Sequence, residues 1–76
     1  MRIQILGTGC AQCDALATDA EKAAQWLGVE YQIERVKDLE YMVGLGARGT
    51  PALAVNGRLL VEGRVPSFEE IRELLA

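Results

Sequence analysis

The first 36 residues change their hydrophobic period twice, and this pattern constrains the fold more than any other feature. Residues 2–6 alternate polar and apolar side chains, which predicts a strand. Residues 11–27 place apolar side chains three and four apart, which predicts an amphipathic helix that Gly28 would end. Residues 29–36 alternate again and predict a second strand. Because strand–helix–strand connections within one sheet are right-handed crossovers, we expect the two strands to form a parallel pair.

The second half of the chain carries the strongest hairpin signal. Asn56-Gly57 joins the apolar runs 52–55 and 58–62, and this dipeptide readily adopts the positive φ angles of a two-residue turn. The hairpin adds an antiparallel pair of strands to the parallel one. We therefore predict an α/β fold, a four-stranded mixed sheet with helices over its faces, in the order strand–helix–strand–helix–strand–strand–helix.

Two shorter helices complete this order. Asp38 is expected to cap a helix that runs to about Leu45. Ser67 and Glu70 have the spacing of a capping box, which predicts a final helix that ends near Leu75. The side chains expected to face the core from the helices include Trp26, Leu39, Met42, Val43, Phe68, Ile71, Leu74 and Leu75.

Length and charge exclude several classes of protein. A chain of 76 residues allows a single domain, residues 1–76, with a thin margin of stability. The net charge is −3 and there is no run of Lys or Arg, so the electrostatic pattern of a nucleic-acid-binding protein is missing. No apolar run approaches the roughly 20 residues of a membrane-spanning helix. We expect a monomer that binds neither nucleic acid nor membranes.

The N-terminal segment bears on the cellular compartment. Residues 1–7 do not have the pattern of a signal peptide, because their apolar stretch is too short. The expected compartment is therefore the cytoplasm. A structural disulfide is hard to maintain in that reducing environment, so a close pair of cysteines is better explained as catalytic or metal-binding.

Cys10 and Cys13 form such a pair where the first strand gives way to the first helix. Residues three apart on a helix lie on one side, about 5–6 Å apart at Cβ, and a small adjustment allows a disulfide. At the helix start, Cys10 would face unpaired N–H groups, which favour the attacking thiolate. Cys13, one turn further on, suits the resolving role. Asp14 disfavours further negative charge nearby, so we expect Cys10 to be less acidic than in strongly oxidising proteins, with a bias toward reduction.

These residues give the chain a resemblance to the thioredoxin superfamily, and more narrowly to its minimal prokaryotic thioredoxin- and glutaredoxin-like proteins. Two motifs carry it, Gly7-Thr8-Gly9-Cys10-x-x-Cys13 after the first strand and Gly49-Thr50-Pro51 before the hairpin. The resemblance extends over essentially the whole chain. It implies a thioredoxin-like fold and the function of a small thiol–disulfide oxidoreductase that exchanges the Cys10/Cys13 dithiol with protein disulfides.

The resemblance also implies roles for other residues. Pro51 would be cis, and Thr50 and Gly63 would contact an extended substrate backbone. Taken alone, Thr50-Pro51 also fits an ordinary turn before a strand, and Gly63 fits a turn glycine. The implied partners are disulfide-containing protein substrates and a thioredoxin reductase or another thiol donor. No cofactor is expected beyond the redox-active disulfide itself.

Three features usual in thioredoxins have no counterpart in this sequence. Gly9 stands where an aromatic residue usually precedes the motif, and Ala11-Gln12 replaces Gly-Pro between the cysteines. The buried acid that assists the resolving cysteine has no evident equivalent.

The main alternative is a chaperone for Cu(I) or another soft metal that uses the same two cysteines, since two thiolates can hold Cu(I). The segment from Gly7 to Cys13 also resembles the heavy-metal-associated domains, which carry Gly-Met-Thr-Cys-x-x-Cys. Those domains end on a strand, whereas this chain ends on a predicted helix. Zinc normally needs four ligands, and the chain has no His. A docking module and a merely packed pair of cysteines are further alternatives, but the order of elements favours the oxidoreductase.

Overall fold

The structure, a computed structural model, describes residues 1–9 and 11–76, so Cys10 lies outside the described residues. None of the helices in these two ranges is long and apolar enough to cross a membrane. The elements, in chain order, are β1 (Arg2–Leu6), α1 (Ala11–Leu27), β2 (Gln32–Val36), α2 (Leu39–Leu45), β3 (Ala52–Val55), β4 (Arg58–Glu62) and α3 (Phe68–Leu75).

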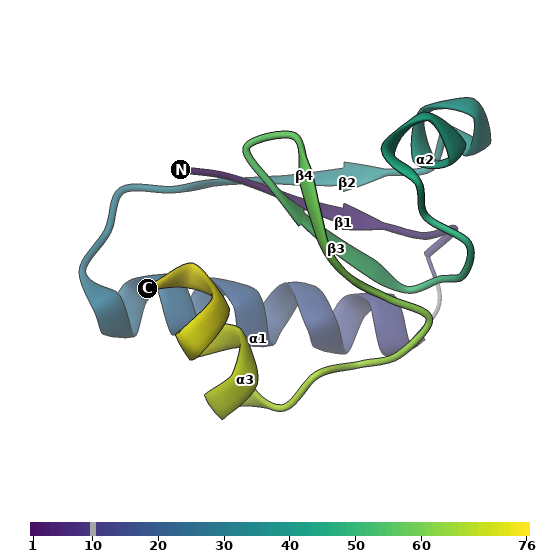
Figure 1. Cartoon of the computed structure of the whole chain (residues 1–76). Coiled ribbons are helices and arrows are strands. Elements are labelled where there is room, and N and C mark those ends of the chain that lie inside the picture. Colours follow the sequence, from purple (N-terminus) through teal and green to yellow (C-terminus); the bar gives the residue numbers. More distant parts are fainter. Residues whose placement is uncertain (10) are drawn as a thin grey trace.

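The four strands form one mixed sheet in the order β2-β1-β3-β4 (Figure 1). β1 pairs with β2 in parallel and with β3 antiparallel, and β3 pairs with β4 antiparallel. The turn between β3 and β4 has positive φ at both Asn56 (53°) and Gly57 (81°), as expected for this dipeptide. The predicted α/β fold with a four-stranded mixed sheet is therefore confirmed.

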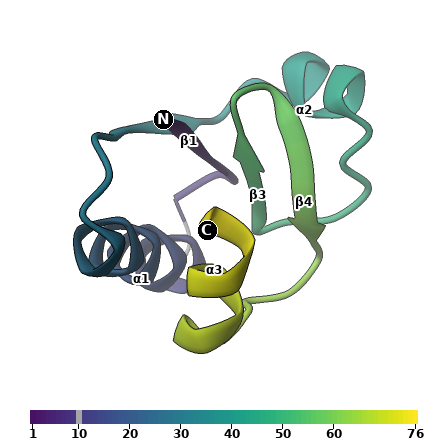
Figure 2. The ribbon, with the colours of Figure 1, turned by 60° about the vertical axis from the view of Figure 1, so that its left-hand side comes forward.

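The helices divide between the two faces of the sheet. α1 and α3 cover one face and α2 lies on the other, at the end where β1 finishes (Figures 1 and 2). Alternation along β1 explains this division, because Ile3 and Ile5 point toward α1 while Leu6 points toward α2. The core under α1 and α3 contains Ile3, Ile5, Cys13, Leu16, Ala20, Ala23, Ala24, Leu53, Val61, Ile71 and Leu75. Among the residues that the structure describes, the cluster under α2 contains three buried members, Leu6, Met42 and Ala52.

Helix ends follow the predicted caps. Gly28 has a φ of 69°, and its N–H donates to the Gln25 carbonyl while the Val29 N–H donates to that of Ala24. These two hydrogen bonds form a Schellman motif, which requires the left-handed conformation that glycine adopts without strain. Asp38 caps α2 by accepting a hydrogen bond from the Glu40 N–H at 3.0 Å.

The second strand is shorter than predicted. The alternation of residues 29–36 suggested one strand, but β2 begins at Gln32. The register pairs Gln32 with Arg2, the first residue of β1, so residues 29–31 have no strand beside them. Alternation alone could not locate this boundary, because it depends on where the neighbouring strand begins.

Three hydrophobic side chains that were expected in the core lie at the surface. Leu39 and Val43 of α2 are 65% and 71% exposed, and Met42 is the one residue of that helix that is buried. Trp26 is 69% exposed, so its interpretation as core packing is wrong. Its ring lies instead under the guanidinium of Arg72, 5.4 Å from the ring centroid, in a cation–π contact. Helix α2 has seven residues and lies on a short sheet, so it can bury only one of its sides. The sequence pattern did not show which side of α2 would be buried.

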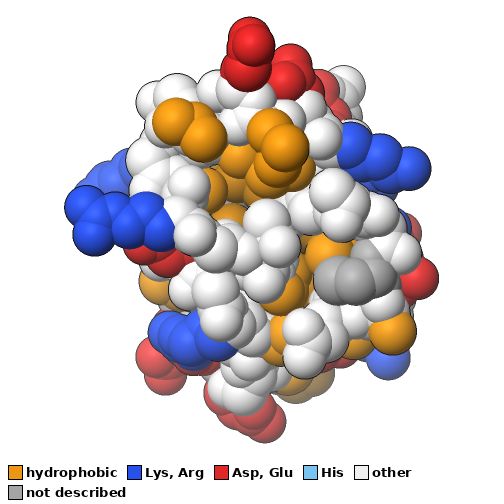
Figure 3. Space-filling view, turned by 90° about the vertical axis from the view of Figure 1, so that its right-hand side faces the viewer, with side chains coloured by type: hydrophobic (Ala, Val, Ile, Leu, Met, Phe, Trp, Pro, Cys, Tyr) orange, Lys and Arg blue, Asp and Glu red, His pale blue; other side chains and the backbone are white. Residues whose placement is uncertain are grey.

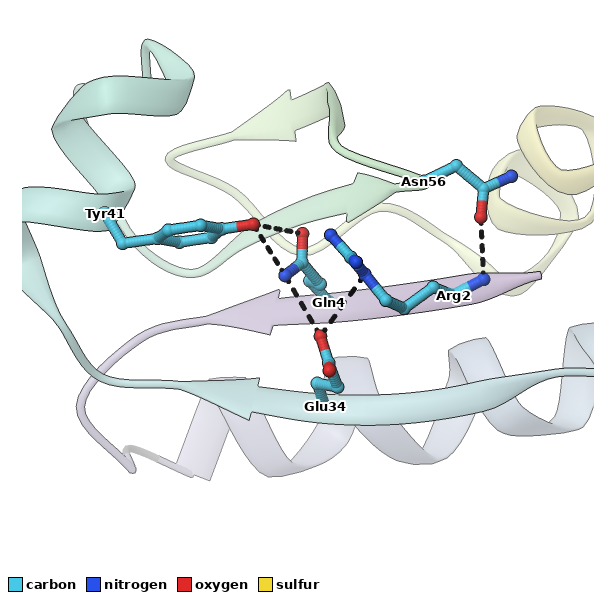
Figure 4. A network of polar contacts seen from close by, with 5 residues as sticks. All are labelled: Arg2, Gln4, Glu34, Tyr41 and Asn56. Carbon is cyan, nitrogen blue, oxygen red and sulfur yellow. Dashed lines mark hydrogen bonds and ion pairs between the residues drawn. The ribbon is translucent and has the colours of Figure 1, made fainter.

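The face of the sheet beside α2 carries a polar network (Figure 4). Gln4 is 3% exposed, and its amide donates to the Tyr41 hydroxyl at 2.8 Å and to the Glu34 carboxylate at 3.1 Å. The Tyr41 hydroxyl donates back to Gln4 Oε1 at 3.2 Å. The Arg2 guanidinium lies 3.4 Å from the Glu34 carboxylate, and the backbone N–H of Arg2 donates to the Asn56 side chain. This network satisfies the one buried polar side chain of the sheet and holds α2 against β1.

Replacing Tyr41 with Phe should therefore lower the free energy of unfolding by about 1–3 kcal/mol, since it leaves the buried Gln4 amide short of a partner. Tyr31→Phe is the matched control. The Tyr31 hydroxyl also makes two hydrogen bonds, to Gln25 and Glu21, but at the surface, so its loss should change stability by less than about 0.5 kcal/mol. Urea denaturation measures both values. Equal losses for the two variants would contradict a stabilising role for the buried network.

Candidate active site

Three segments meet at one end of the sheet, beside the first turn of α1 (Figure 1). Leu6 at the end of β1 is in register with Ala52 at the start of β3, and Ala52 is in register with Glu62 at the end of β4. The residues just beyond these three positions are therefore neighbours in space. They are Gly7, Pro51 and Gly63.

Cys13 lies in the first turn of α1 and is 1% exposed. Its Sγ is packed so closely against Gly7 that the Cβ of any other residue there would overlap it. The same Cβ position lies 3.9 Å from Thr50 Cβ. The structure thus brings Cys13 and Thr50, two of the sequence-predicted site residues, close to the same point beside Gly7, a glycine that leaves room for the sulfur.

The segment from Gly49 to Pro51 leads into β3 from the surface. The peptide bond between Thr50 and Pro51 is cis. Thr50 is exposed, whereas Pro51 is buried. The Pro51 carbonyl accepts a hydrogen bond of 3.0 Å from the Gly63 N–H, which ties this segment to the residue that follows β4.

Gly63 is exposed and has a φ of 74°, a conformation that strains any residue with a side chain. A Cβ on Gly49 would lie 3.2 Å from Gly63 Cα, so the two glycines allow their backbones to approach closely. On the other side of this contact, the Arg48 N–H donates to the Glu62 carboxylate at 2.8 Å. The turn interpretation of Gly63 thus has a conformational basis, and the same residue also borders Thr50-Pro51.

Arg35 is a charged neighbour of the site that the sequence did not suggest. Its guanidinium binds the Asp14 carboxylate at 2.8 Å and so places a positive charge beside the residue that follows Cys13. Arg35 is in register with Ile5, which faces α1, so it points toward the same face of the sheet. Extending the alternation of residues 29–36 to Arg35 would have placed it on that face. From the sequence, Asp14 was expected to act with no cation beside it, but the Arg35 guanidinium offsets its negative charge.

The surface at this end of the molecule is mostly uncharged. Figure 3 shows it face on, with uncharged atoms and hydrophobic patches over the middle and the Lys, Arg, Asp and Glu side chains lying mostly toward the rim. A surface of this kind fits a polypeptide segment better than it fits a small anion or cation.

An ion pair fixes the chain just beyond Gly63. Arg64 donates two hydrogen bonds to the Glu70 carboxylate, at 2.8 and 2.5 Å. These bonds lower the pKa of Glu70 below its ordinary value and raise that of Arg64. The predicted capping box is therefore only half formed. Ser67 Oγ accepts from the Glu70 N–H at 3.1 Å, but the Glu70 carboxylate binds Arg64 instead of turning back to the helix end.

Within residues 1–9 and 11–76, no three His, Cys, Asp or Glu side chains gather where they could hold a metal ion. Cys10 lies outside these residues. Nothing in the described geometry favours the copper-chaperone alternative, and a helix, α3, follows the β3–β4 hairpin, as expected for the oxidoreductase.

The fold and the cysteine at the start of α1 define a class, the thiol–disulfide exchange proteins with a thioredoxin-like fold. A family model described as "Thioredoxin domain" matches residues 1–76. A protein named thioredoxin from Methanothermobacter thermautotrophicus is 42% identical over 76 residues, which are 100% of this chain and 99% of that one. Another of that name from Methanocaldococcus jannaschii is 36% identical over 73 residues, 96% of this chain and 84% of its own. The chain belongs to the thioredoxin family.

Membership settles the general activity. The protein is a small thiol–disulfide oxidoreductase, as the resemblance of its motifs implied. The family also implies, in general terms, protein disulfides as substrates and a reductase as partner.

Gly7→Ala tests the close packing at the site. The added methyl group needs the space of Cys13 Sγ, so we expect overpacking to cost about 1–3 kcal/mol of stability and to slow disulfide reduction. Gly44→Ala is the control, because a Cβ there meets no heavy atom within 4 Å and alanine suits helix α2. Urea denaturation and insulin reduction measure the two effects. Wild-type values for Gly7→Ala in both assays would show that the site is not tightly packed.

The Arg64–Glu70 pair predicts a pH dependence. A carboxylate whose pKa is lowered by folding contributes stability that is complete above its unfolded pKa, about 4.3, and that is lost as the pH falls through the lower folded value. An NMR titration should therefore find Glu70 titrating below its ordinary pKa in the wild type and closer to it in Arg64→Gln. Lys22→Gln, an exposed change on α1, should leave the Glu70 titration unaltered. An identical Glu70 curve in the wild type and Arg64→Gln would refute the pairing in solution.

Proposed function

We propose that Cys10 and Cys13 are the exchanging dithiol, with Cys10 as the nucleophile and Cys13 as the resolving residue. The observation that carries this assignment is the burial of Cys13 Sγ against Gly7 in the first turn of α1. A sulfur with almost no exposed surface is poorly suited to attack a disulfide on another protein. It is well suited to attack a mixed disulfide held next to it, so the first attack falls to the other cysteine of the pair.

The reaction has two exchange steps. The Cys10 thiolate attacks one sulfur of a substrate disulfide, whose bond breaks, and the second substrate sulfur leaves as a thiolate and takes up a proton. The Cys13 thiol then loses its proton and attacks the Cys10 sulfur. The mixed disulfide breaks, the first substrate sulfur leaves, and a Cys10–Cys13 disulfide remains. Two electrons have passed to the substrate, and a reductase or another thiol donor must return them.

We further propose that Thr50, Pro51 and Gly63 form the substrate-binding edge. Thr50 is exposed beside Gly7 and Cys13, so an extended segment that runs along its backbone would bring a disulfide close to the dithiol. Pro51 is held from behind by its bond to the Gly63 N–H. Gly63 leaves the flank of this edge without a side chain, and the uncharged surface in Figure 3 suits a polypeptide.

The proposed direction is reduction of protein disulfides, with residues 1–76 acting as one domain in the reducing cytoplasm. Such a compartment favours dithiols kept for exchange over structural disulfides. The Arg35–Asp14 pair supports a site without strong excess charge of either sign, in which the start of α1 supplies most of the activation of the thiolate. No cofactor beyond the cysteine pair is required for these steps.

Insulin reduction with dithiothreitol as electron donor tests the assignment. Cys10→Ser should reduce the rate to the uncatalysed background, because the attacking sulfur is gone. Cys13→Ser should also lose turnover, and when the reduced variant is mixed with substrate after dithiothreitol has been removed, it should trap a mixed disulfide that mass spectrometry detects. Ala15→Ser, an exposed change on the same helix, is the matched control and should keep wild-type activity. Retained turnover in Cys10→Ser, or trapping by Cys10→Ser and not by Cys13→Ser, would overturn the proposed roles.

A further inference from the structure

The segment that carries Thr50 is attached to the end of β4 by three successive contacts. The Arg48 N–H donates to the Glu62 carboxylate at 2.8 Å, Gly49 approaches Gly63, and the Pro51 carbonyl accepts from the Gly63 N–H at 3.0 Å. Thr50 lies between the second and third contacts and is exposed. Of the three contacts, only the first is made by a side chain.

Glu62 occupies the position from which this contact is possible because of the sheet register. It is opposite Ala52, the residue that follows Pro51, so its side chain can reach back along the incoming segment. A hydrogen bond from a backbone N–H to an ionised carboxylate is stronger than one between neutral groups. Arg48 lies between α2 and β3, so this bond is not part of the hydrogen-bonding pattern of a helix or of the sheet.

We propose that Glu62 is a positioning residue for substrate binding: its carboxylate fixes the backbone of Arg48 and thereby holds Thr50 ready to receive an extended substrate. This inference rests on the proposed role of Thr50. Without the bond, the segment from Arg48 to Thr50 keeps more conformational freedom, and substrate binding must supply the cost of ordering it. A substitution at Glu62 leaves both cysteines in the sequence and does not alter α1, which carries Cys13, so the chemical steps keep their rate.

The predicted signature is therefore a change in KM without a change in kcat. Because this bond is exposed to water, its net contribution is taken as that of a typical protein hydrogen bond, about a fivefold change in an equilibrium constant. Glu62→Ala should raise the KM for a disulfide-containing protein about fivefold at unchanged kcat. Glu62→Gln keeps an oxygen that can accept from the Arg48 N–H and should restore a KM close to the wild type.

The controls separate positioning from a general loss of structure. Glu73→Ala removes an exposed carboxylate from α3, away from this segment, and should leave KM unchanged. Amide hydrogen exchange at Arg48, followed by NMR, should be slow in the wild type and in Glu62→Gln and fast in Glu62→Ala. If Glu62→Ala folds incompletely, Glu62→Thr replaces it, because threonine suits a strand and its hydroxyl ends two atoms short of the carboxylate position.

Each outcome bears on a different claim. A raised KM in Glu62→Ala, with rescue in Glu62→Gln and faster exchange at Arg48, supports the positioning role. An active wild type with an unchanged KM in Glu62→Ala overturns it, as does a fall in kcat at constant KM. A wild type that reduces no protein disulfide overturns the proposed function as well, and this result is seen before any variant of Glu62 is compared.

Discussion

The pairing of β1 with β3 determines where every functional segment of this protein lies. β1 is central in the sheet, and its antiparallel register with β3 puts Leu6 opposite Ala52. Gly7 therefore leaves β1 at the point where Pro51 enters β3. Since α1 starts only a few residues after Gly7, Cys13 returns to the same point from the other side. A shift of this register by one residue would turn Ile3 and Ile5 away from α1 and separate the site at the same time.

Glycines at this end of the sheet serve two different purposes. Gly7 and Gly49 are needed for space, because a side chain would collide with Cys13 Sγ in one case and crowd the backbone of Gly63 in the other. Gly63 is needed for its backbone conformation as well. The site is thus built by removing side chains around one sulfur and one exposed threonine, and the hydrogen bonds from Arg48 and Gly63 make up for the packing that the glycines do not supply.

The order of elements and the segments that meet beside Cys13 could be predicted from the sequence because both depend on local signals. Periods of two and of 3.6 residues mark strands and helices, and Asn56-Gly57 marks the hairpin. The two motifs that include Cys13 and Thr50 mark segments that lie close together. The contacts of Arg35 and Glu62 could not be predicted in the same way. The Arg35–Asp14 contact joins residues 21 positions apart, and the Arg48–Glu62 contact joins residues 14 positions apart. Both contacts depend on the sheet register. The pattern also could not decide between burial and exposure for Trp26, Leu39 and Val43. A short helix such as α2 has room to bury only part of its apolar surface, whereas Trp26, at the end of the longer α1, lies against Arg72 of α3.

The slender attachment of α2 has a consequence for local opening of the fold. Met42 is the only residue of this helix that is buried, and the Tyr41–Gln4 hydrogen bonds are its main polar link to the sheet. Detachment of helix α2 from the sheet therefore breaks few contacts, and its amides should exchange with solvent through openings that leave the sheet intact. The anchors of the following segment lie on β4 and not on α2. We therefore expect Thr50 to stay in place when α2 opens. The exposed edge beside Cys13 then keeps its shape during local opening of α2 on the other face of the sheet.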